Sequence, residues 1–192
     1  PGLPQRTLRD VMQEARSNPR RMNFGSGGQG SSAHLAMEAL LMQNGSQMTH
    51  VPFKGIAAAM VEVVAERIDV AIGSVGSTAT FLKDGRLHGL AVSGDARHPM
   101  FPNVPTFAEA GFPQFDFSAW YAVFAPARTP KDVVAKLSGA LSTALKNPDV
   151  ISRLNAVGVA VGTGDAAQLA RFLPGENERI GLLIRTANIK PD

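Results

Sequence analysis

The chain has 192 residues, 44% of them hydrophobic and 18% charged, with a formal net charge of +3 at pH 7. This composition supports one large or two small domains with a hydrophobic core, and it excludes disordered, collagen-like and coiled-coil proteins. Without cysteine there is no thiolate chemistry or cysteine-bound zinc, the scattered basic residues argue against nucleic acid, and no apolar run reaches the roughly 20 residues of a membrane span.

The first predicted elements are a helix, a short strand and a glycine-rich turn. The helix covers residues 7–17, because Thr7 can cap its start and Asp10 follows three residues later as a shortened capping box. The strand covers residues 21–24. The glycine-rich turn follows over residues 25–32 and leads into a second helix, which is expected to end at an Asn-Gly pair.

The glycine-rich turn predicts an anion site, because glycine lets the backbone approach a ligand and the helix start attracts negative charge. Gly25, Gly27 and Gly30 fit the G-x-G-x-x-G pattern of dinucleotide-binding proteins. The next strand, however, ends in Lys54 where an acid would hold a ribose, and Ser31 stands where a P-loop needs lysine. Lys54 favours a carboxylate or phosphate. A plain tight turn with a serine N-cap stays open as the alternative.

Strands and helices alternate through the first half of the chain, which predicts an α/β fold with a mostly parallel sheet and helices on both faces. The four strands are expected at residues 21–24, 48–53, 68–73 and 87–93. The loops after the first three strands are residues 26–32, 54–56 and 74–78. Ligands bind beyond the carboxyl ends of such strands. All three loops are small, polar or cationic and carry no carboxylate, which favours an anionic ligand.

No catalytic or metal site is expected. Residues 73–77 fail the G-x-S-x-G spacing of a nucleophile elbow. The four histidines, His34, His50, His88 and His98, contain no H-x-x-x-H pair. His34 lies in the first turn of the helix after the glycine-rich loop, where it either approaches a bound anion or faces solvent.

The second half of the chain is predicted to be mostly helical. Prolines interrupt residues 94–113, which hold one short helix at 107–110. Strands are expected at residues 115–125, as a crossing between two lobes, and at 159–161; helices are expected at 131–146, 148–156 and 165–187, the last kinked or divided by Pro174. One or two strands cannot form a sheet, so the apolar faces of these helices need a partner.

Motifs along nearly the whole chain resemble the Bug family, the periplasmic solute-binding receptors of tripartite tricarboxylate transporters. The similar stretches are NFGSGGQGS (23–31), VPFKG (51–55), GLAVS (89–93), NVPTFAEAG (103–111), FAPARTP (124–130) and ANIK (187–190). The resemblance implies a fold like that of type II periplasmic binding proteins, a Venus flytrap of two α/β lobes. It also implies a small carboxylate as ligand, membrane components of the transporter as partners, a periplasmic location, no enzymatic activity and no cofactor.

Carried over by position, the resemblance places most of the candidate ligand-binding residues in the first two loops, and the third loop adds two serines. They are Ser26, Gly27, Gly28, Ser31, Ser32 and His34, then Lys54 and Gly55, then Ser74 and Ser77. Residues 1–118 would form the second ligand-binding lobe. Residues 119–192 would form the crossing strand and the helical C-terminal part of an incomplete first lobe.

Because the resemblance lacks the start of the first lobe and no signal peptide is visible, we expect an excerpt from a longer protein. Its exposed apolar faces would include Val133, Leu137, Leu141 and Phe172 and would favour a homodimer. Two alternatives stay open. One is a nucleotide- or phosphate-binding α/β enzyme that uses the turn at residues 25–30, and the other is a truncated, dimerising scaffold that binds no ligand.

Overall fold

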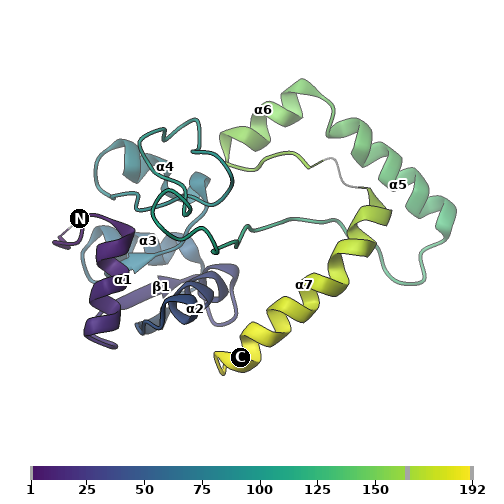
Figure 1. Ribbon diagram of the computed structural model, residues 1–192. Coiled ribbons are helices and arrows are strands. Elements are labelled where there is room, and N and C mark those ends of the chain that lie inside the picture. Colours follow the sequence, from purple (N-terminus) through teal and green to yellow (C-terminus); the bar gives the residue numbers. More distant parts are fainter. Residues whose placement is uncertain (1, 163–164, 191–192) are drawn as a thin grey trace. The chain divides into compact units, whose positions relative to one another are not determined.

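The computed structural model describes residues 2–162 and 165–190, and the chain divides into two compact units (Figure 1). Unit 1 is Pro1–Gly73, Ser77–Ala119 and Leu182–Asp192; unit 2 is Ser74–Gly76 and Trp120–Gly181. Within the described residues, none of the helices combines the length and the apolar character needed to cross a bilayer.

A three-stranded parallel sheet lies at the centre of unit 1, in the order β2-β1-β3. The strands are β1 (Asn23–Ser26), β2 (Thr49–Pro52) and β3 (Val70–Ala71). The helices of this part of the chain are α1 (Leu8–Ser17), α2 (Ser32–Asn44), α3 (Ile56–Val64) and α4 (Val75–Lys83). Helix α2 packs on β1 and on α1, and α3 packs on β1 and β3. The predicted α/β class with a parallel sheet and flanking helices is confirmed.

The core of unit 1 is built around β1. Phe24 of this strand is fully buried, with Leu40 of α2 and Val11 of α1 beside it in the same cluster. Helix α1 forms as the sequence predicts: the Asp10 amide donates to Thr7 Oγ1 at 3.2 Å, and the Thr7 amide donates to Asp10 Oδ2 at 3.3 Å. Its apolar stripe, Leu8, Val11, Met12 and Ala15, is buried in this cluster.

The predicted strand at residues 87–93 is wrong. Only Val92 makes a bridge, and it pairs with Thr106 instead of extending the sheet. The Val92 amide donates to the Pro105 carbonyl at 2.8 Å, and the Phe107 amide donates to the Val92 carbonyl at 3.1 Å. Both backbone groups of Val92 therefore pair with the proline-rich segment, and the described sheet has three strands.

Four further local predictions are also corrected. Residues 107–110 form a hydrogen-bonded turn around Thr106 and Glu109 in place of a helix. Residues 115–125 and 159–161 form no strand. Helix α4 already begins at Val75, so most of the predicted loop 74–78 is its first turn.

Unit 2 contains α5 (Lys131–Ala144), α6 (Pro148–Ala156) and most of α7 (Ala166–Thr186). The bounds predicted for α6 are confirmed, and those of α5 and α7 agree within two residues. Pro174 lies inside α7 without dividing it. Trp120 packs edge-on against Phe172, with ring centroids 5.4 Å apart, and its Nε1 donates to Glu176 Oε1 at 3.1 Å.

Candidate functional site

Two loops are joined at the carboxyl ends of β1 and β2. The Phe53 amide donates to the Ser26 carbonyl at 3.1 Å, and the Gly55 amide donates to the Gly27 carbonyl at 3.3 Å. These bonds continue the parallel pairing of the two strands beyond their ends. The structure therefore brings the first two predicted loops, residues 26–32 and 54–56, together at one edge of the sheet, the edge formed by the carboxyl ends of its strands.

Glycine is required at this edge for two separate reasons. A Cβ at Gly27 would lie 3.1 Å from the Ile56 backbone nitrogen, so a side chain there would push the two loops apart. Gly28 has φ +125° and Gly30 has φ +68°, a region of backbone conformation that side chains rarely adopt. Two of the glycines that fit a dinucleotide pattern, Gly27 and Gly30, are thus explained by close contact between loops and by backbone conformation.

Two helices begin at the same edge. Helix α2 starts after Ser31, whose Oγ accepts the His34 amide at 3.4 Å. Helix α3 starts after Gly55, which has no side chain to cap the first amides. Unpaired amides and the positive ends of two helix dipoles favour a negatively charged group here. Ser32, Lys54 and Gly55 are exposed at this edge.

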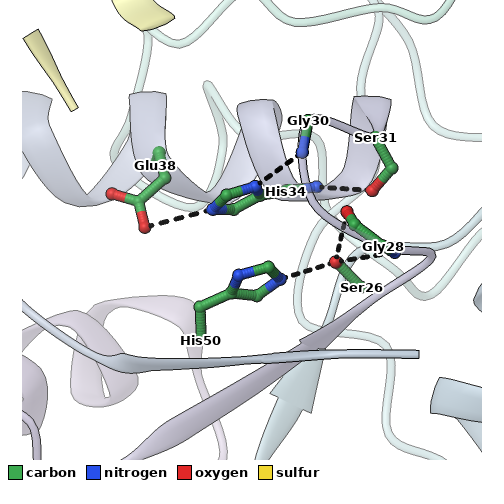
Figure 2. Close-up of polar contacts among 7 residues, drawn as sticks. All are labelled: Ser26, Gly28, Gly30, Ser31, His34, Glu38 and His50. Atoms are coloured by element: carbon green, nitrogen blue, oxygen red, sulfur yellow. Dashed lines mark hydrogen bonds and ion pairs between the residues drawn. The ribbon is translucent and has the colours of Figure 1, made fainter. Parts of the chain in front are cut away.

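A buried polar network lies under the glycine-rich loop, as Figure 2 shows. Ser26 Oγ lies 2.6 Å from His50 Nε2 and accepts the Gly28 amide at 3.2 Å. The His50 and His34 rings stack, with centroids 3.7 Å apart and an angle of 13° between their planes. His34 Nδ1 accepts the Gly30 amide at 3.1 Å, and its Nε2 lies 3.7 Å from Glu38 Oε1.

Burial sets the ionisation of this network. It lowers the pKa of His34, and together with the charge of His34 it lowers the pKa of His50 to about 4. Burial raises the pKa of Glu38. Both imidazoles are therefore neutral at pH 7, and the network holds the loop by neutral hydrogen bonds instead of ion pairs.

The predicted site residues fall into three groups. Ser26 and His34 are buried, with 0% and 3% of their surface exposed, and their hydrogen bonds support the loop from inside. The half-buried or exposed residues of the joined loops are Gly27, Gly28, Ser31, Ser32, Lys54 and Gly55. Ser74 is exposed before α4 and belongs to unit 2, whereas Ser77 is half-buried inside α4 in unit 1. Direct ligand contact by any of them stays a prediction.

Sequence reasoning did not single out His50 and Glu38. His50 comes next to Ser26 only through strand pairing, in which Phe24 faces His50 across the sheet. Glu38 could have been found from its i, i+4 spacing to His34 on one helix. No local pattern in the chain marks His50.

Comparison with known proteins supports this description. The family described as "Tripartite tricarboxylate transporter family receptor" matches residues 1–189. A UPF0065 protein from the tcbD–tcbE intergenic region of Pseudomonas sp. (strain P51) is 37% identical over 180 residues, which are 93% of this chain and 54% of that protein. Protein BugT of Bordetella pertussis is 27% identical over 190 residues, covering 99% of this chain and 58% of BugT.

Solved structures show the same fold. Rpa4515 of R. palustris, determined with adipate, superposes with a TM-score of 0.87 at 29% identity over 100% of this chain and 64% of that one. MatC from Rhodopseudomonas palustris, determined with bound malate, gives a TM-score of 0.84 at 30% identity over 94% of this chain and 63% of that one. The periplasmic binding protein BugD gives 0.85 at 25% identity, over 100% of this chain and 64% of BugD.

The chain thus spans 54% of the length of the Pseudomonas relative and 63–64% of these structures. Within that span, the match runs through both units and includes the joined loops at the sheet edge. The predicted resemblance is confirmed: the chain belongs to the receptor family of tripartite tricarboxylate transporters.

Proposed function

We propose that the chain carries the carboxylate-binding edge of a periplasmic receptor that delivers a small carboxylate to the membrane components of a tripartite tricarboxylate transporter. In this proposal residues 1–118 are the second ligand-binding lobe, and residues 119–192 belong to the first. The chain has no catalytic role and needs no cofactor.

The observation that carries the proposal is the joining of loops 26–32 and 54–56 by backbone hydrogen bonds at the starts of two helices. Neither loop contains an acidic residue, and Lys54 adds a cation. Such an edge suits a ligand with ionised carboxyl groups. Adipate and malate, the molecules named for the two related structures, are both dicarboxylates.

The nucleotide alternative needs an acidic residue at the end of β2 to hold a ribose. Lys54 occupies the place after this strand, and the amides of Gly28 and Gly30 are bonded to Ser26 and His34 within the chain. The alternatives differ in the ligand that binds, so titration of one protein sample with several ligands separates them.

The test is isothermal titration of the 192-residue chain with malate, adipate and NAD⁺ at pH 7.5. We expect binding of at least one dicarboxylate and about tenfold weaker binding by Lys54→Ala, because a charge-assisted contact is lost. Lys136→Ala, which removes an exposed lysine from α5 in unit 2, is the matched control and should bind like the parent chain. Binding of NAD⁺ alone, or equal affinities for the two variants, would overturn the proposal.

A further inference from the structure

The hydrogen bond between Gly30 and His34 fixes the protonation state of the imidazole. A backbone amide can only donate, so His34 Nδ1, 3.1 Å from the Gly30 nitrogen, must present its lone pair. The neutral ring then carries its hydrogen on Nε2, on the side of Glu38. A second proton can only go to Nδ1, where it would meet the Gly30 amide and abolish that hydrogen bond.

Protonated His34 has an alternative partner in place. Glu38 Oε1 lies 3.7 Å from His34 Nε2, which is beyond hydrogen-bond distance in the neutral state. An imidazolium would be drawn toward this carboxylate, because the pair would then carry opposite charges. The structure shows the ring bonded to the loop, and Glu38 lies where a protonated ring would pair with it instead.

His50 holds the His34 ring in the first arrangement. It stacks on His34 at 3.7 Å and is itself stacked on Phe24, with centroids 4.8 Å apart. Its Nε2 contacts Ser26 Oγ, the same hydroxyl that accepts the Gly28 amide. Two amides of the glycine-rich loop, those of Gly28 and Gly30, are thus held by one connected network.

The groups that face the imidazole pair come from three elements. Helix α2 contributes Glu38, β2 contributes His50 itself, and β1 contributes Ser26 and the uncharged ring of Phe24. Burial opposes a charged His34, and a charge on His34 in turn opposes protonation of His50, while the Glu38 carboxylate lies where it would attract a charged His34. These opposing effects place the change of state on the acid side of neutrality.

We propose that His34 is a positioning residue for the glycine-rich loop, and that protonation of its Nδ1 frees the Gly30 amide, loosens the loop and weakens carboxylate binding. The binding part of this inference rests on the function proposed above. The coupling between His34 and Gly30 is a property of the chain itself and needs no ligand.

The first test is a pH titration of the ¹⁵N-labelled chain by NMR without ligand, from pH 8 to pH 4. We expect His34 Nδ1 to show the shift of an unprotonated nitrogen at pH 8. The Gly30 amide resonance should move with the same midpoint as the His34 ring. A Gly30 amide that does not follow the His34 titration would overturn the proposal.

The second test compares malate and adipate affinity at pH 7.5 and pH 5 for three variants. His34→Asn keeps an acceptor near the position of Nδ1 but cannot titrate, so it should retain the loop and lose the pH dependence. His34→Leu removes the acceptor and should bind weakly at both pH values. His98→Asn is the matched control, because His98 Nδ1 also accepts a backbone amide, that of Met100 at 3.2 Å, outside the loop.

The carboxyl groups of the ligand also take up protons near pH 4. This affects every variant equally, so the affinity of each variant is divided by that of His34→Asn at the same pH. The parent chain and His98→Asn should lose affinity relative to His34→Asn as the pH falls from 7.5 to 5, in proportion to the fraction of His34 that the NMR titration shows to be protonated. A His34→Asn profile equal to that of the parent chain would refute the proposal. If no carboxylate binds to any chain at pH 7.5, the receptor function fails, while the NMR titration still decides the role of His34.

Discussion

The two units of this chain contain similar helices and differ in what those helices cover. In unit 1, the apolar stripe of α1 is buried against α2 and the sheet, and Leu8, the most exposed residue of that stripe, retains only 5% of its surface. In unit 2, the corresponding stripe of α5 leaves Val133 42%, Leu137 51% and Leu141 41% exposed. No residue that the structure describes in unit 2 is buried.

This difference separates helix formation from core formation. Capping residues and an apolar stripe specify where a helix lies in the sequence, whereas stability comes from the surface against which the stripe packs. Unit 1 contains a sheet that provides this surface. The prediction of exposed apolar faces at Val133, Leu137, Leu141 and Phe172 is confirmed, and association through them as a homodimer stays a prediction.

The largest effect on stability is expected from truncating one phenylalanine in each unit. Phe24→Ala deletes a fully buried ring in unit 1 and should lower the free energy of unfolding by about 3–5 kcal/mol. Phe172→Ala deletes a ring that is 44% exposed in unit 2 and should cost about 1 kcal/mol or less. Urea unfolding followed by circular dichroism measures both changes.

The chain has a single tryptophan, Trp120, which lies in unit 2 and reports on that unit by fluorescence. If the units unfold separately, Phe24→Ala should move the circular dichroism transition far more than the fluorescence transition. Coincident circular dichroism and fluorescence transitions in both variants would show that the two units unfold together. Equal losses of unfolding free energy in Phe24→Ala and Phe172→Ala would contradict the difference in packing between the units.

The second effect is the acid sensitivity of the buried histidine pair in unit 1. The pKa of His50 is lowered to about 4, so between pH 6.5 and about 4 the unfolded chain binds a proton that the native state does not. Stability should therefore decrease as the pH falls through this range, by up to about 3 kcal/mol for a shift from 6.5 to about 4. The lowered pKa of His34 acts in the same direction.

Glu38 opposes this loss, because its raised pKa lets the native state take up a proton before the unfolded chain does. Unfolding free energies at pH 7.5 and pH 5 measure the net change. His50→Asn should reduce the dependence on pH, and His98→Asn should leave it as in the parent chain. An unchanged slope in His50→Asn would contradict the assignment of this effect to the buried pair.

The smallest effect is expected on the exposed face of α5. Leu137→Glu with Leu141→Lys places an acid and a base four residues apart on this face, and the free energy of unfolding should change by no more than about 0.5 kcal/mol. Fluorescence of the apolar dye 1-anilinonaphthalene-8-sulfonate should fall, because two exposed apolar side chains are removed. A loss of several kcal/mol would mean that this face is covered in solution.

The features that were predicted correctly depend on neighbouring residues. The capping box of Thr7 and Asp10, the left-handed Gly45 at the end of α2 and the bounds of α6 are all specified within a few residues. The predicted strand at residues 87–93 failed because its pairing involves residues far apart in sequence. Residues 87–93 have the composition of a strand, but Val92 pairs with Thr106, and nothing near Val92 in the sequence specifies that pairing.

The candidate site divides in the same way. The backbone of the glycine-rich loop and the start of α2 follow from local sequence, because Gly28, Gly30 and Ser31 specify them. The support beneath the loop does not, because His50 reaches Ser26 only through the pairing of β1 with β2. The sequence around a histidine in a strand does not indicate which ring will stack on it.

The bond from Gly30 to His34 ties the loop to the first turn of the helix that follows it. Surface loops usually accept insertions at little cost, because the entropy of loop closure grows slowly with length. Here an added or deleted residue between Ser26 and His34 would disturb the bonds to Gly28 and Gly30 together. The length of this loop is therefore not free to vary, whereas exposed positions such as Ser32 and Lys54 can be substituted without disturbing these bonds.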